Sequence, residues 1–299
     1  MGKDLYDAFP VARDAYHAVD DALDTALSTL AFDGPADELT RTVNAQPALL
    51  THSAAVWAVV RETIGTSVVA AAGHSLGEFS AYHVAAMFDL RAAATLVRRR
   101  GELMYEQGVA RPGAMAAVLG VLTSSIEAIC DQATAERGLV VPANFNSAEQ
   151  VVISGDVAGV ERAMELCKEA GAKRCLPLPV SGAFHSPLME GAVPGLDAAL
   201  AAAEWHTPRI PVVANVNGEF VREASRARAL LLEQLTSPVR WTSVMQQLVN
   251  AYPKALFVEI GTGAVLTGLA RRLAPDIQTA TCGTIGEVDS LLQRVGAHD

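Results

Sequence analysis

The stretch SVVAAAGHSLGEFSAYH (residues 67–83) places a serine between two glycines, after an apolar run and before a segment with helical spacing. The run over 67–72 is short and ends at Gly73, which is typical of a buried strand, and residues 76–86 predict a helix. A strand, a sharp turn and a helix in that order indicate a parallel α/β protein. The sequence therefore predicts an α/β fold with Ser75 at the turn.

A different pattern interrupts this fold in the middle of the chain. Strands are predicted at 113–120, 139–146, 150–156 and 173–180, and helices at 124–136 and 157–170. This βαββαβ order is typical of a ferredoxin-like unit. Further strand-like runs follow at 210–216, 255–261 and 279–283. We therefore expect a hydrolase-like large domain with a parallel sheet, formed by 1–109 and 181–299, and an inserted ferredoxin-like small subdomain, 110–180.

Composition excludes several classes of protein. The net charge of −10 argues against nucleic acid or an anionic membrane as the main partner. No apolar run approaches the roughly 18 residues that span a bilayer, and the first residues lack the apolar core of a secretory signal. The four cysteines lie far apart without metal-ligand spacing, which favours reduced thiols and no metal site. We expect a cytoplasmic protein.

The GxSxG motif is a nucleophile elbow when it lies between a strand and a helix. The glycines permit a tight turn that projects the Ser75 hydroxyl, and the N–H of Leu76 then points toward a developing oxyanion. The alternative is a Gly-Ser turn that only caps the helix. The predicted strand and helix on either side favour the catalytic interpretation.

A serine nucleophile needs a base, usually histidine. The chain has seven histidines. His74 adjoins the serine but lies on the turn itself, where reaching the hydroxyl is awkward. His185, in PVSGAFHSPLM, follows the strand that leaves the small unit, and this junction places it at a cleft between domains. We therefore predict His185 as the general base.

Several motifs together resemble one family. In order along the chain they are GHSLGE, VRRRGELM, GAMAAVLG, PANFNSAEQVVISG, LPVSGAFHSPLM, LTSPVRW and FVEIGTGAVLTGLARR. This set is similar to the malonyl-CoA:acyl carrier protein transacylases, and the resemblance extends from about residue 3 to 285. Seven motifs in order are hard to explain by chance.

The resemblance implies a role for each matching residue. Ser75 matches the acyl-accepting serine, His185 the general base, and Arg100 the arginine that holds the substrate carboxylate. Gln234 matches the position whose main-chain or amide oxygen orients the histidine. A physical argument supports Arg100: malonyl differs from acetyl by one carboxylate, so selecting malonyl requires a buried positive fork.

Phe184 and Leu76 bear on substrate choice. In similar acyltransferases a bulky Phe before the histidine is associated with malonyl selection, because it crowds a branch at the α-carbon. Leu76 after the nucleophile is likewise of the malonyl type. One methyl clash is worth about 1–3 kcal/mol, so the implied selectivity is finite.

The front of the chain departs from the family. Its members normally open with a strand and a glycine-rich FPGQGSQ-type loop, whose second glutamine lies against the oxyanion, and this sequence contains no such segment. We therefore expect one sheet strand and one oxyanion donor to be missing. The explanations, in order of preference, are an internal start codon, a genuinely short chain with weak activity, and a copy without catalysis.

The resemblance implies a two-step transfer of malonyl from malonyl-CoA, through Ser75, to the phosphopantetheine thiol of acyl carrier protein. It implies no cofactor and leans toward a monomer, in fatty acid or polyketide synthesis. One alternative is an α/β-hydrolase, either an esterase or a thioesterase. That class does not predict the inserted unit or Arg100. The other alternative is a catalytically impaired protein that binds acyl carrier protein.

Overall fold

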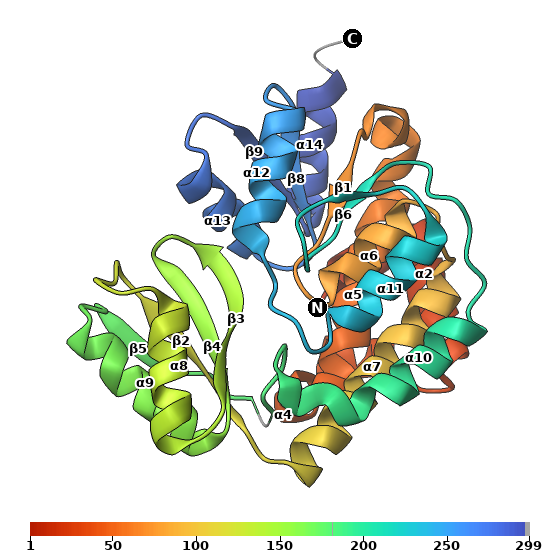
Figure 1. The fold of residues 1–299 in the computed structure, drawn as a ribbon. Coiled ribbons are helices and arrows are strands. Elements are labelled where there is room, and N and C mark those ends of the chain that lie inside the picture. The colour runs from red at the N-terminus through yellow and green to blue at the C-terminus, as the bar shows by residue number, and fades with distance from the viewer. Residues whose placement is uncertain (181, 297–299) are drawn as a thin grey trace.

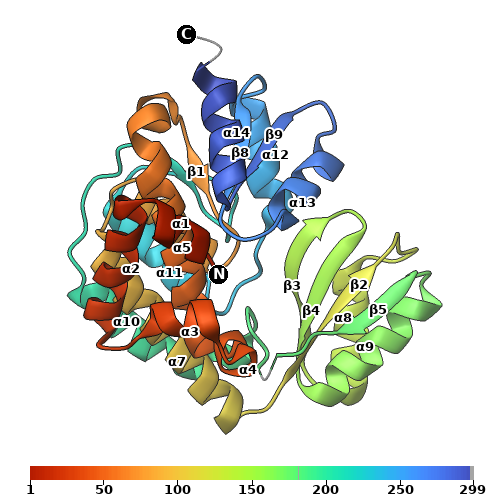
Figure 2. The same ribbon diagram turned by 180° about the vertical axis from the view of Figure 1, so that it is seen from behind.

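The computed structural model describes residues 1–180 and 182–296, and these form two units (Figures 1 and 2). The larger unit is a mixed α/β assembly of many helices around short strands. The smaller unit, coloured yellow to green, is a sheet with two helices packed against it. No helix in the described part of the chain combines the length and apolar character needed to cross a bilayer.

The small unit follows the order that the sequence predicts. Its elements are β2 (Ala114–Leu119), α8 (Ile126–Arg137), β3 (Val140–Ser147), β4 (Gln150–Gly155), α9 (Val157–Glu169) and β5 (Arg174–Pro177). The sheet order is β3-β4-β2-β5, and every neighbouring pair is antiparallel. Alternation explains the layers: Ala116 and Val118 of β2 pack beneath the helices, whereas Met115 and Ala117 point to the opposite face.

Helices make up most of the large unit. They are α1 (Lys3–Ala8), α2 (Pro10–Leu23), α3 (Leu27–Asp33), α4 (Ala36–Thr40), α5 (Thr42–Ile64), α6 (Gly77–Val84), α7 (Leu90–Ala110), α10 (Val193–Ala202), α11 (Ala224–Glu233), α12 (Trp241–Ala251), α13 (Val265–Leu273) and α14 (Ile285–Gly296). Short 3₁₀ turns cover Gly65–Ser67 and Pro187–Ala192. α2 ends at Leu23 because the chain turns left-handed at Asp24 (φ 47°), before α3 begins.

The strands of the large unit fall into two separate sheets. β1 (Ala71–Ala72) pairs in parallel with β6 (Val212–Val213), which pairs in antiparallel fashion with β7 (Phe220–Val221). β8 (Leu256–Ile260) pairs in parallel with β9 (Gln278–Cys282). The expectation of one parallel sheet is therefore only partly correct. The strands predicted at 67–72 and 210–216 also shrink to two paired residues each.

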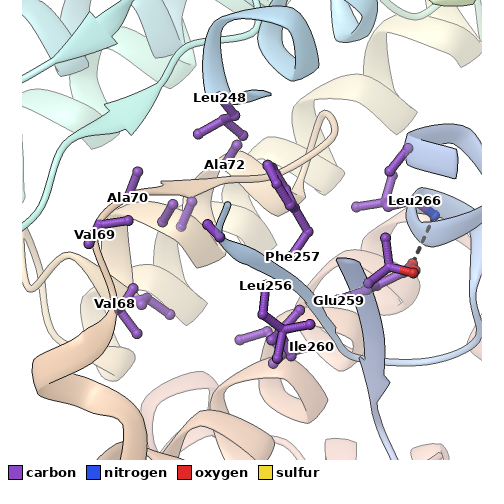
Figure 3. Close-up of a pocket in the computed structure, with 18 of the residues that line it drawn as sticks. Val68, Val69, Ala70, Ala72, Leu248, Leu256, Phe257, Glu259, Ile260 and Leu266 are labelled. Carbon is purple, nitrogen blue, oxygen red and sulfur yellow. Dashed lines mark hydrogen bonds between the residues drawn. The ribbon is translucent and has the colours of Figure 1, made fainter. Parts of the chain in front are cut away.

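A cavity of about 780 Å³ separates the two sheets (Figure 3). Its wall includes Val68–Ala72 on one side and Ala255–Ile260 on the other, with Leu248 and Leu266 nearby. In a strand, one face contributes only alternate residues. Because consecutive residues of both strands line the cavity, their backbone edges, and not one face, are exposed to it.

Candidate active site

Ser75 sits on a strained turn between β1 and α6. Its φ is +53°, in the left-handed region that non-glycine residues rarely occupy. Gly73 makes this turn possible, since a Cβ there would lie 1.9 Å from the carbonyl oxygen of Gly77. A Cβ on Gly77 would meet nothing within 4 Å. Packing therefore requires the first glycine of the motif, and not the second.

Asn215 holds both sides of this turn. It follows β6, the parallel neighbour of β1, so the two strand ends meet at the same edge. The Asn215 Oδ1 accepts the Ser75 N–H at 2.7 Å, and its Nδ2 donates to the Gly73 carbonyl at 2.8 Å. This buried side chain thus offsets the strain at Ser75 with two hydrogen bonds.

The structure brings Ser75 and His185 together. The Ser75 Oγ lies 2.7 Å from His185 Nε2, and His185 Nδ1 lies 2.9 Å from the main-chain oxygen of Gln234. A carbonyl only accepts, so Nδ1 carries the proton and Nε2 is free to take one from the serine. Burial, reinforced by the charge of Arg100, lowers the pKa of His185 to about 3. The imidazole is therefore neutral at physiological pH.

Arg100 reaches Ser75 from α7. Only 1% of its surface is exposed. Its guanidinium donates to Gln46 Oε1 at 2.7 Å, to Gln234 Oε1 at 3.0 Å and to Ser75 Oγ at 3.1 Å, and its Nε has no partner within the described residues. Burial lowers the pKa of Arg100 to about 10, which leaves it charged at neutral pH. A buried cation held by neutral oxygens is suited to bind a carboxylate.

Leu76 and Phe184 lie at the edges of this site. In the described part of the chain no group accepts the Leu76 N–H, which sits at the amino end of α6. Phe184 packs between the large core and the Met115 cluster of the small unit. The oxyanion role of Leu76 and the selective role of Phe184 stay predictions.

Sequence reasoning missed three buried polar residues that the site uses. Gln46 contacts Arg100, and Asn215 contacts Ser75. Glu78 lies behind Gln234, whose Nε2 donates to the Glu78 carboxylate at 2.7 Å. Gln46 and Asn215 each stand as a lone polar residue in an apolar run, AQPALL or VVANV, and Glu78 is the charged residue of GEFSAY. That signal identifies a buried polar group, but it does not say which partner the group meets.

Other groups of catalytic type point elsewhere. His74 Nε2 lies 2.8 Å from Asn146 Oδ1 on β3 of the small unit, so His74 ties the turn to that unit. The cavity of Figure 3 is lined by Gly73 and Gly77 but not by Ser75, His185 or Arg100. The polar site and the apolar cavity are therefore distinct, although residues of the same turn border both.

Comparisons with known proteins agree with this geometry. Residues 1–289 match the family described as "Acyl transferase domain". The malonyl CoA-acyl carrier protein transacylase of Bacillus subtilis is 44% identical over 93% of this chain and 87% of its own length. The protein of the same name from Escherichia coli K12 is 40% identical over 97% of this chain and 93% of its own.

Solved structures show the same likeness. The acyl-carrier-protein-S-malonyltransferase of Bartonella henselae matches with a TM-score of 0.93 and 41% identity, covering 99% of this chain and 95% of that one. A type II PKS acyl-carrier protein in complex with its malonyl-transacylase matches with a TM-score of 0.92 and 39% identity, covering 98% and 94%.

The two glycines of the motif should differ sharply when replaced. Gly73→Ala should lower the free energy of unfolding by about 3 kcal/mol or more, because its Cβ meets backbone that cannot move aside. Gly77→Ala is the matched control and should change it by about 1 kcal/mol or less, in the stabilising direction. Urea unfolding measures both, and equal effects would contradict the turn geometry.

His185 should not titrate near its ordinary pKa. Because burial and Arg100 disfavour the imidazolium, its ring resonance in NMR should stay constant from pH 8 to pH 5 and should move into the ordinary range in urea. Arg100→Ala should raise the pKa of His185 by removing the adjacent positive charge. A folded protein in which His185 titrates near 6.5, with or without Arg100, would show that the guanidinium does not act on the base.

Proposed function

The chain belongs to the acyl transferase family, and we propose that it transfers malonyl from malonyl-CoA to the phosphopantetheine thiol of acyl carrier protein. One observation carries the proposal: the buried Arg100 guanidinium lies 3.1 Å from the Ser75 Oγ, which is also 2.7 Å from the His185 base. An acyl acceptor and a carboxylate-binding group therefore share one site.

The first half-reaction loads the serine. His185 Nε2 takes the hydroxyl proton as Ser75 Oγ bonds to the thioester carbonyl carbon. The N–H of Leu76 stabilises the oxyanion. When the intermediate collapses, the carbon–sulfur bond breaks and His185 returns the proton to the sulfur. CoA leaves as a thiol, and a malonyl ester remains on Ser75.

The second half-reaction transfers the malonyl group from Ser75 to the carrier protein. The phosphopantetheine thiol of acyl carrier protein gives its proton to His185, and its sulfur attacks the ester carbonyl. Collapse breaks the carbon–oxygen bond, and the proton returns to Ser75 Oγ. The similar structure of a malonyl-transacylase with a type II PKS acyl-carrier protein supports this partner. Ping-pong kinetics follow from the covalent intermediate.

The negative charge of the malonyl substrate makes His185 a stronger base. Arg100 is one of the two main causes that lower the pKa of His185. A malonyl carboxylate on Arg100 offsets that positive charge and so favours proton uptake by the imidazole. Acetyl-CoA brings no such charge. Arg100 therefore discriminates for malonyl both in binding and in the proton transfer.

The alternatives account for less of the site. An esterase or thioesterase would use Ser75 and His185 but has no need of Arg100 at the nucleophile. A protein that only binds acyl carrier protein would need neither the strained serine nor the neutral histidine. The names of the similar proteins also favour the transferase.

The finer features of the fold belong to the same proposal. The sheet order β3-β4-β2-β5 and a core cluster of its own support a ferredoxin-like small subdomain, 110–180, inserted in a large domain of 1–109 and 181–299. Each step uses only side chains and substrate thiols, so we propose no cofactor. All four cysteines are free thiols, which fits a cytoplasmic protein, and we propose a monomer.

We also infer that the apolar cavity of Figure 3 takes an extended strand, parallel to β1 and β8. Both strands present an open backbone edge to the cavity, and a strand between them would pair with each. Gly2 lines a second, smaller pocket together with Gly261 and Gly283, which follow β8 and β9 at the carboxyl edge of the sheet. A strand that runs through the cavity parallel to β1 and β8 would leave it at that edge. The strand-and-loop opening of the family has this character.

Intact-mass measurement after brief exposure to malonyl-CoA tests the transferase. The purified chain should gain one malonyl group, which disappears on addition of holo acyl carrier protein. Ser75→Ala should show no adduct. Arg100→Ala should lower malonyl loading about 100-fold, because the lost contact is to a charge, and should not lower acetyl loading, because His185 without the adjacent guanidinium is a stronger base. Loss of the adduct in buffer as fast as with carrier protein would indicate a thioesterase.

A fused amino-terminal strand tests the cavity. An extension of about six Val- and Ile-rich residues and a glycine linker should slow amide hydrogen exchange at 68–72 and 256–260 by about 10-fold or more. The same extension with two prolines is the control, because proline cannot donate to the ladder. Equal protection by both extensions, or by neither, would contradict the strand.

A further inference from the structure

A buried carboxylate, that of Glu78, lies behind the site and takes no part in the proposed steps. It stands on the first turn of α6, three residues after the nucleophile, and none of its surface is exposed. Its Oε2 accepts from Gln234 Nε2 at 2.7 Å and from the Asn215 N–H at 3.1 Å, and its Oε1 accepts from the Tyr82 hydroxyl at 3.3 Å. It forms no salt bridge within residues 1–180 and 182–296.

One amide separates this carboxylate from the buried cation. Gln234 Oε1 accepts from Arg100 at 3.0 Å, while Gln234 Nε2 donates to Glu78. The partners permit only this orientation, because a guanidinium can only donate and a carboxylate accepts. Two opposite charges, each costly to bury alone, thus face each other across an aligned amide dipole.

Glu78 also acts on the other two parts of the site. The carbonyl of Gln234 is the acceptor that orients His185. Asn215, whose N–H is held by Glu78, clamps the Ser75 turn through its side chain. One carboxylate is therefore hydrogen-bonded to both residues that position the nucleophile and the base.

We propose that Glu78 is a positioning residue that supplies the counter-charge of Arg100 through the Gln234 amide, and so sets how tightly the site holds a malonyl carboxylate. The proposal rests on the proposed function. A malonyl carboxylate on Arg100 meets the negative charge of Glu78 behind it, which weakens binding. The same charge favours the imidazolium that forms on His185 during transfer.

The two effects have opposite signs in kinetics. If Glu78 loses its charge, Arg100 attracts malonyl more strongly, so KM for malonyl-CoA falls. His185 becomes a weaker base, so kcat falls as well. A residue that only supports the fold gives a different result, because a loosened site raises KM while it lowers kcat.

The ionisation of Glu78 provides a second readout. Burial raises the pKa of Glu78 to about 7. Two charged or titratable groups face Glu78. They are Arg100, with a pKa lowered to about 10, and Tyr82, with a raised pKa. The charge of Arg226 opposes the rise in the pKa of Tyr82. His185, one contact beyond, has a pKa of about 3. Between pH 6 and 8, Glu78 becomes negative as pH rises, whereas Arg100, Tyr82 and His185 keep their charge states.

Glu78→Gln tests the proposal, because it keeps the size and one oxygen that can accept from Gln234 and Asn215, and it removes the charge; its amide nitrogen can donate to the Tyr82 hydroxyl oxygen. At pH 8 it should lower KM for malonyl-CoA by about 5- to 10-fold and lower kcat. KM for acetyl-CoA should not change. Glu233→Gln removes an exposed charge next to Gln234 and is the matched control, with both constants unchanged. A raised or unaltered KM for malonyl-CoA in Glu78→Gln would overturn the proposal.

The unaltered protein gives the same answer if the variant does not fold. Its KM for malonyl-CoA, divided by its KM for acetyl-CoA, should rise from pH 6 to pH 8. Both substrates share the CoA groups, so their titration cancels in the ratio, and only the malonyl carboxylate is repelled by the charge of Glu78. A flat ratio would also overturn the proposal. Absence of any malonyl adduct on Ser75 would instead reject the proposed function itself, so the two failures are distinguishable.

Discussion

The site depends on one constraint, the burial of a permanent positive charge beside the Ser75 hydroxyl. Arg100 stays charged, and its side chain is almost fully enclosed. Its nearest acceptors are neutral: the Gln46 amide, the Gln234 amide and the serine hydroxyl. A carboxylate in direct contact would neutralise the guanidinium and compete with an anionic substrate. Keeping the counter-charge one amide away leaves the cation available.

The partner of the histidine follows from the same constraint. A triad acid beside His185 would lie close to Arg100 and to the substrate carboxylate. The main-chain oxygen of Gln234 fixes the tautomer equally well at 2.9 Å without adding a charge. The acid is nonetheless present as Glu78, behind the amide of the same glutamine. Glu78 therefore contacts the side chain of the residue whose main-chain oxygen meets His185, and does not contact the imidazole itself.

The sequence could predict the residues whose chemistry has a local signature. GxSxG marks Ser75, the domain junction indicates His185, and the resemblance adds Arg100 and Gln234. It could not predict Gln46, Glu78 or Asn215 as a network, because their contacts join elements far apart in the chain, such as Arg100 with Gln46 and Gln234. In the fold, the order of elements in the small unit was predictable because short apolar runs and helical patterns follow one another as βαββαβ. The strands at 67–72 and 210–216 were overestimated. Among the described residues β1 pairs only with β6, and β6 pairs with β1 and β7 over the same two residues, Val212 and Val213.

The small unit is itself part of the constraint on the base. Its edge strand β3 forms two main-chain hydrogen bonds with Val239. The Phe145 N–H donates to the Val239 oxygen at 2.9 Å, and the Val239 N–H donates to the Ala143 oxygen at 2.8 Å. Val239 lies five residues after Gln234, whose carbonyl holds His185. On the other side, the Arg240 N–H donates to the Asn215 carbonyl at 2.8 Å. The segment that orients the base is thus anchored to both units, so a shift of the small unit would be felt at His185 through the backbone.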